Sequence, residues 1–126
     1  MSTLKLDTLS NKAGTASVPS DTIVSGTAKA WVNFNGTGTV AIRRAFNVSS
    51  ITDNGTGDYT ANFSTAFADA NYAMTSSSAN TGPTMSIASP QLAATPFTTT
   101  TARVETRNTI SGALLDCQFV LLSFFS

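Results

Sequence analysis

Residues 30–63 read AWVNFNGTGTVAIRRAFNVSSITDNGTGDYTANF, and the motif Asn-Gly-Thr-Gly occurs in them twice, at 35–38 and at 54–57. Asn-Gly is the strongest short-range signal for a β-hairpin, because both residues tolerate the positive φ angles of tight hairpin turns. Each copy is flanked by alternating apolar and polar residues, which is typical of half-buried strands. The stretch therefore predicts two hairpins that follow one another as an antiparallel β meander.

Strand-like alternation continues to the end of the chain. It indicates about eight short strands and no amphipathic helix of useful length, so the predicted fold is all-β, an antiparallel β-sandwich. In the last third of the chain, Arg103, Glu105 and Arg107 alternate with Ala102, Val104 and Thr106, and we expect the three charged residues on a solvated polar face. We expect strands over residues 29–34, 39–46, 47–52, 58–63, 72–76, 85–88, 98–108 and 113–125.

The composition favours a structural or binding module over an enzyme. Charged residues make up 11% of the chain, and seven basic residues balance seven acidic ones. A neutral, charge-poor surface disfavours nucleic acid as a partner, because phosphate binding needs clustered Lys and Arg, and it favours self-association. The sequence contains no histidine, which removes Ser-His and Cys-His catalysis. We therefore expect no catalytic residues and no cofactor.

Cys117 is the single cysteine, and its apolar surroundings in the sequence predict a small buried hydrophobic residue. Residues 1–20 lack the apolar stretch of a secretory signal. No run reaches the roughly 18 apolar residues that cross a bilayer, so we expect no membrane insertion.

Residues 1–28 differ in character from the rest, and we assign them to an extended N-terminal arm that precedes a sandwich domain over 29–126. Leu4, Leu6 and Leu9 give the arm its apolar positions, whereas residues 11–20 are rich in Gly, Ala, Ser and Pro. A short apolar strand followed by a flexible linker cannot bury itself, so we expect these leucines to anchor the arm on another chain or a larger body. The alternative is a disordered leader.

The C-terminal stretch 119–125 is the most hydrophobic in the chain and is apolar on both faces of a strand. A strand buried on both faces lies in the centre of a sheet or at a subunit interface. The sequence thus predicts an oligomer interface made by Phe119, Val120, Leu121, Leu122, Phe124 and Phe125.

Sites for chemistry are weakly indicated. Asp53 and Asp58 bracket the second motif, but aspartate commonly caps a turn through its own side chain, which disfavours a catalytic pair. The oxygens of residues 53–58 suit a hard cation such as calcium, yet the spacing lacks the EF-hand pattern and its bidentate Glu, so metal binding there is left open. Arg43 and Arg44 should point to opposite faces of a strand and form no joint patch.

Three aromatic residues, Trp31, Tyr59 and Tyr72, could stack on sugar rings if they lay in one groove. Packing in the core or at an interface is the favoured interpretation.

Several stretches in the first 72 residues resemble a known protein family. Residues 29–43 (KAWVNFNGTGTVAIR), 46–60 (FNVSSITDNGTGDYT) and 62–63 resemble a domain repeated in tail fibre and related virion proteins of tailed phages, notably those of marine and cyanobacterial hosts. Residues 70–72 (ANY) continue the pattern, and residues 2–9 (STLKLDTL) resemble the leader common in such proteins. The match covers a little under half of the chain.

The resemblance implies a non-enzymatic, β-rich virion component, usually a homotrimer. We expect other virion proteins as partners, and a host surface glycan is left open as a further one. The chain is too short to include a fibre shaft. Two positions on the particle therefore stay open: a small fibre or fibre tip on the tail, and a capsid decoration (cement) protein held by its arm. A glycan-binding module is a further alternative.

Overall fold

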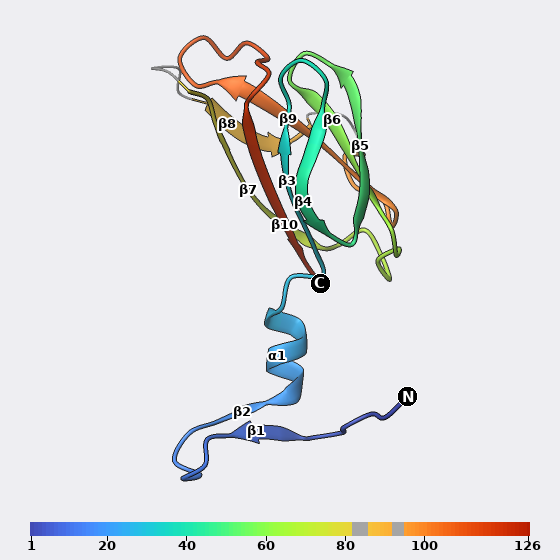
Figure 1. Cartoon of the computed structure of the whole chain (residues 1–126), viewed down its shortest axis with the longest axis vertical. Coiled ribbons are helices and arrows are strands. Elements are labelled where there is room, and N and C mark those ends of the chain that lie inside the picture. The colour runs from blue at the N-terminus through green and yellow to red at the C-terminus, as the bar shows by residue number, and fades with distance from the viewer. Residues whose placement is uncertain (82–85, 92–94) are drawn as a thin grey trace.

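The body of the protein is a sandwich of two antiparallel sheets, as seen in a computed structural model that describes residues 1–81, 86–91 and 95–126 (Figure 1). Its strands are β3 (Ala30–Asn35), β4 (Ala41–Phe46), β5 (Val48–Gly55), β6 (Asp58–Phe63), β7 (Ala73–Ala79), β8 (Ser86–Pro90), β9 (Thr101–Asn108) and β10 (Phe119–Phe125). The first sheet has the order β4–β3–β10–β7, and the second sheet has the order β5–β6–β9–β8. The predicted all-β antiparallel sandwich is confirmed.

Some strand bounds differ from the predicted ones. β9 begins at Thr101 rather than at 98, because the Thr98 hydroxyl accepts hydrogen bonds from the backbone N–H groups of Thr100 (3.2 Å) and Thr101 (3.0 Å) and holds a turn. β7 continues to Ala79, past the predicted end at 76, and β10 begins at 119 rather than 113. The predicted start of the strand over 85–88, Met85, lies outside the described residues.

The two predicted hairpins form, but they belong to different sheets. β3 pairs with β4 in the first sheet, and β5 pairs with β6 in the second. Asn47 alone separates β4 from β5, and its positive φ of 54° turns the chain from one sheet to the other. Its side chain holds this corner by accepting the Thr65 N–H at 2.7 Å and donating to the Lys29 carbonyl at 3.1 Å. The prediction of a single meander is therefore wrong.

The core lies between the two sheets and is built from alternate strand positions. Buried and half-buried residues alternate strictly along β3 and β6, as their sequence pattern predicts. The Phe63 ring packs edge-to-face on Tyr72 and Phe124, with ring centroids 5.7 Å and 5.0 Å away. Such pairs add about 0.5–1.5 kcal/mol each beyond the area they bury. Cys117 is fully buried, as predicted.

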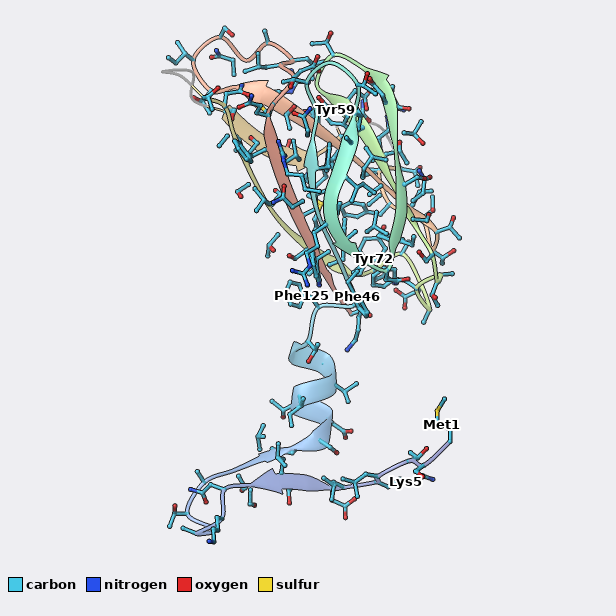
Figure 2. All side chains as sticks on the ribbon, viewed as in Figure 1. Met1, Lys5, Phe46, Tyr59, Tyr72 and Phe125 are labelled. Atoms are coloured by element: carbon cyan, nitrogen blue, oxygen red, sulfur yellow. The ribbon has the colours of Figure 1, made fainter. Side chains whose placement is uncertain are left out.

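The connections gather at the two ends of the sandwich. Both Asn-Gly-Thr-Gly motifs and the β9–β10 connection lie at the end far from the arm, which we call the distal end (Figure 1). Figure 2 shows Tyr59 near this distal end, and Phe46 and Phe125 at the opposite end beside the arm.

The N-terminal arm stands away from the sandwich (Figure 1), but it is not a uniformly extended chain. It contains an antiparallel pair of strands, β1 (Thr8–Ser10) and β2 (Ser17–Pro19), followed by a helix, α1 (Ser20–Gly26). The arm leucines at positions 4, 6 and 9 are 82%, 47% and 53% exposed. Their role as an anchor stays a prediction. No helix in the described part of the chain is long and apolar enough to cross a membrane.

Candidate interaction surface

The outer face of the first sheet exposes apolar side chains. Side chains alternate along a strand, so β10 directs Phe119, Leu121, Ser123 and Phe125 away from the core. Phe119 and Leu121 are 37% and 41% exposed. Because β10 lies between β3 and β7, these residues occupy the middle of the face rather than its border.

Two aromatic residues of neighbouring strands extend this surface. Trp31 of β3 lies opposite Ser123 of β10 and, on its other side, opposite Phe46 of β4. Directly opposite residues share one face of a sheet. Trp31 is half-buried, and Phe46 is 54% exposed. We call this set the apolar face; its members are Trp31, Phe46, Phe119, Leu121 and Phe125.

A β-bulge in β4 places two arginines at the border of the apolar face. Arg43 has no Cα partner on β3, whereas Arg44 lies opposite Asn33. Arg43 donates to the Gln118 carbonyl at 2.7 Å and to Asn33 Oδ1 at 3.4 Å, and its guanidinium lies 4.5 Å from the Phe119 ring centroid, a cation–π contact. Both arginines are exposed on this side. The prediction that they point to opposite faces is wrong, because a bulge interrupts the alternation of a strand.

A hollow of about 200 Å³ opens on the same side of the sheet. It is lined by Thr75, Ser76 and Ser77 of β7 and by Leu121 and Ser123 of β10. These strands carry no charged residue, and the outward side chains around the space are those of Thr75, Ser77, Leu121 and Ser123. The hollow can take an aliphatic side chain without burying a charge.

The predicted interface residues of 119–125 divide between this face and the core. The three outward ones belong to the apolar face, and their role as an interface stays a prediction. Val120, Leu122 and Phe124 are at most 2% exposed. The prediction is wrong for these three, because a strand sends alternate residues to opposite faces and theirs is the inner one.

Phe46 shows how the bulge misleads a reading of the sequence. Unbroken alternation predicts Ile42 and Phe46 on the same side of β4. The structure packs Ile42 against the core and exposes Phe46, because the extra residue at Arg43 reverses the sides that follow it. Only the extra residue in the register between β3 and β4 shows that Phe46 faces outward, and the sequence pattern does not reveal this bulge.

A hydrogen-bonded cluster, which we call the distal clasp, joins the two Asn-Gly-Thr-Gly motifs. The Tyr59 hydroxyl lies 2.9 Å from both the Gly36 carbonyl oxygen and Asp116 Oδ1. Asp116 Oδ1 also accepts the Gly57 N–H at 2.7 Å, and the Cys117 carbonyl accepts the Gly36 N–H at 2.8 Å. Burial, reinforced by the bond to Asp116, raises the pKa of Tyr59 far above its usual value, so the phenol stays a neutral donor.

The outer face of the second sheet is polar and internally paired. Arg103 binds Asp58 through two contacts of 2.9 Å and 2.6 Å, and these hydrogen bonds lower the pKa of Asp58. Arg107 binds Glu105 in the same bidentate way, at 2.6 Å and 3.0 Å. Glu105 is only 3% exposed. The prediction of a solvated position is therefore wrong for Glu105, whose carboxylate is buried in its ion pair.

Two of the three aromatic residues considered for sugar stacking are inaccessible. Tyr59 is 0% exposed and Tyr72 is 4% exposed. The Tyr72 hydroxyl lies 2.9 Å from the Thr101 carbonyl, and burial raises the pKa of Tyr72 to about 12. Neither ring can stack on a sugar, so the sugar-stacking alternative is wrong for both. Trp31 lies on the apolar face, and sugar stacking stays a prediction for this residue.

Asp53 and Asp58 engage different partners. Asp58 is held by Arg103, whereas Asp53 Oδ1 accepts the Gly55 N–H at 3.0 Å and caps the turn. Within residues 1–81, 86–91 and 95–126, no group of three or more candidate ligand residues is placed to hold a metal ion.

Comparison of the chain with protein-family models, with curated proteins and with solved structures finds no match.

Proposed function

We propose that this protein is a non-enzymatic structural component of a tailed-phage virion, similar to tail fibre domains, that acts in particle assembly or host attachment. The observation that carries the proposal is the apolar face. Contiguous exposed apolar side chains mark interaction surfaces, and interface centres are rich in Trp, Phe and Arg. The sequence resemblance of residues 29–63 supports the virion setting.

The apolar face suits contact between copies of this chain, which we take to form a homotrimer. Four of the five charged residues in the strands of the second sheet are paired within the chain, as Asp58–Arg103 and Glu105–Arg107, and the fifth, Asp53, caps a turn. The first sheet instead presents aromatic rings bordered by Arg43 and Arg44. Association through the first sheet buries apolar area, which is the main favourable contribution in most protein–protein contacts.

The N-terminal arm offers a second contact. Leu4, Leu6 and Leu9 are exposed along it. Full burial of a leucine against a partner contributes roughly 1.5–3 kcal/mol. The arm therefore suits attachment of the sandwich to a neighbouring chain or to the particle. The same layout fits a capsid decoration protein, which is the competing position on the virion.

Cryo-electron microscopy of intact virions at side-chain resolution tests the location. The expected result is sandwich density on the tail, with three copies around one axis and their apolar faces buried. Density on the capsid shell would replace the fibre position by decoration. Absence of this protein from purified virions would contradict both the tail position and the capsid position.

Self-association has its own test with a matched control. Leu121→Lys places a charge in the middle of the apolar face, whereas Ile87→Lys makes the same kind of change on the second sheet, where Ile87 is 52% exposed. Light scattering coupled to size-exclusion chromatography should show a monomer for the first variant and an unchanged trimer for the second. A monomeric parent protein, or equal behaviour of both variants, would contradict association through this face.

A further inference from the structure

Among the described strands, β7 is the edge strand with the least protection. Sheet edges expose unpaired N–H and C=O groups, which proteins normally guard with charges, bulges or proline. β4 carries a bulge at Arg43 followed by Arg44. β5 has two register shifts and contains Asp53, and β8 is five residues long and ends in Pro90.

β7 has none of these devices. Its sequence is AMTSSSA, and it pairs with β10 over seven consecutive positions without a register shift. In the part of the chain that the structure describes, no strand pairs with its other side. The inward hydroxyls of Ser76 and Ser78 lie 2.7 Å from the Ala88 carbonyl and 3.1 Å from the Ser86 hydroxyl, which ties β7 to the second sheet. The open edge of β7 therefore presents unpaired backbone groups on a strand that is fixed in position, and an added strand can pair with them.

Residues 2–6 of the arm have the complementary property. They form no regular structure and are exposed throughout, and β1 begins only at Thr8. As an extended segment they place Leu4 and Leu6 on one side and Lys5 on the other. The charge of Lys5 disfavours the edge of β4, where Arg43 and Arg44 lie, whereas β7 and β10 carry no charge.

The hollow beside β7 provides the matching side-chain site. A strand added to β7 sends every second side chain to the outer face, next to Thr75 and Ser77. Leu4 and Leu6 then lie beside Thr75 and Ser77, at the border of the hollow of about 200 Å³, and β7 separates them from Leu121 of β10. Lys5 points to the opposite side, which Met74, Ser76 and Ser78 of β7 share.

We propose that residues 2–6 of one copy pair as an added strand with the open edge of β7 in a second copy of this chain, with Leu4 and Leu6 on the outer face beside Thr75 and Ser77. The inference rests on the proposed function in one respect, that the arm is an assembly segment. Arm exchange is a head-to-tail contact, which generates a ring when the rotation closes. It thus gives a trimer a contact that the apolar face alone does not supply.

Disulfide trapping between separately prepared chains tests the pairing. Leu6→Cys protein is mixed with Ser77→Cys protein, and a mild oxidant is added; the native Cys117 is buried. The expected product is a disulfide-linked heterodimer in which peptide mass spectrometry joins positions 6 and 77. Leu6→Cys mixed with Ile87→Cys is the control and should give no such product. Equal linkage to both partners, or none, would overturn the proposal.

Further measurements distinguish exchange of the arm between copies from an arm that folds back on its own sandwich. Linkage that forms only within one chain carrying both cysteines would show that the arm folds back on its own sandwich, which overturns exchange between copies. Replacing Leu4 and Leu6 together by Ser should weaken association by about a hundredfold or more, while Ile87→Ser, at an exposed position of the second sheet, leaves it unchanged. Density for this protein on the tail or capsid without paired arms would contradict arm exchange and leave the proposed function standing. Paired arms in a protein that is absent from virions would contradict the proposed function and leave arm exchange standing.

Discussion

The two Asn-Gly-Thr-Gly motifs have the same sequence and lie at the same end of the molecule, yet they form different turns. The first copy begins at Asn35, the last residue of β3, and its other three residues lie in the connection 36–40 between β3 and β4. In the second copy, Thr56 and Gly57 alone separate β5 from β6. Neither Asn has a positive φ; the second copy has positive φ at Gly55 (132°) and Gly57 (64°), and the first only at Gly38 (63°). The motif therefore predicts a turn without specifying its geometry.

The glycine that tolerates no side chain also differs between the copies. A Cβ at Gly36 would lie 2.5 Å from the Tyr59 hydroxyl, whereas one at Gly38 would meet nothing within 4 Å. In the second copy the positions are reversed: a Cβ at Gly57 would lie 2.5 Å from a backbone oxygen of β9, and one at Gly55 would meet nothing within 4 Å. Different neighbours crowd the two copies: the Tyr59 hydroxyl of the distal clasp lies against Gly36, whereas the backbones of Thr106 and Leu115 lie against Gly57.

The largest expected effect comes from the last glycine of each motif. Gly57→Ala and Gly38→Ala both place alanine at a positive φ, which costs roughly 1–2 kcal/mol. Gly57→Ala adds contacts of 2.5 Å to the Thr106 oxygen and 2.7 Å to the Leu115 nitrogen, both backbone atoms. Urea denaturation should show a loss of about 3–5 kcal/mol for Gly57→Ala and only the backbone cost for Gly38→Ala. Equal losses would mean that the two copies are equivalent after all.

A double-mutant cycle at the clasp should give a smaller effect. Gly36→Ala alone forces its methyl group against the Tyr59 hydroxyl, and Tyr59→Phe alone removes a buried donor at a cost of about 1–2 kcal/mol. Because Phe also relieves part of the contact, the double variant should be more stable than the sum predicts, by about 0.5–1 kcal/mol. Strict additivity in urea denaturation would show that the first motif and Tyr59 are not coupled.

The clasp should also make stability depend on alkaline pH. Burial raises the pKa of Tyr59 in the folded state, so between the unfolded value near 10 and the folded value the folded state binds more protons. The stabilising contribution is complete below pH ~10 and falls as pH rises above it, by at most about 1.4 kcal/mol per pH unit for one group. Unfolding free energies measured across this range should fall less steeply for Tyr59→Phe. Tyr72, with its pKa raised to about 12, contributes a parallel decline that this variant leaves in place.

The smallest expected effect is chemical rather than energetic. Deamidation at Asn-Gly begins when the glycine nitrogen attacks the asparagine side-chain carbon and releases ammonia. In the first copy the Gly36 N–H is bonded to the buried Cys117 carbonyl; in the second the Gly55 N–H is bonded to the exposed carboxylate of Asp53. Peptide mass spectrometry after prolonged incubation should find conversion to Asp at Asn54 before Asn35. Faster conversion at Asn35 would contradict the protection that the clasp gives the first copy.

Much of the fold could be predicted because its signals are local. Alternation along β3 and β6, turn residues at each motif and the apolar setting of Cys117 all depend on neighbours in the sequence. The apolar face could be predicted from the sequence only in part. Its outward β10 residues follow from the hydrophobicity of 119–125, but the same pattern also selects Val120, Leu122 and Phe124, because a strand that is apolar on both sides does not reveal which side faces the core.

The sequence by itself thus determined that this chain forms antiparallel strands, where most of them lie, and which residues turn the chain, because backbone preferences and period-two patterning are properties of adjacent residues. Long-range contacts decided the rest. The corner at Asn47 assigns the two hairpins to opposite sheets, the bulge at Arg43 moves Phe46 to the outside, and the position of β9 between β6 and β8 buries Glu105. Each of these depends on a segment that meets its partner only when the sandwich closes, so no pattern within one strand can encode it.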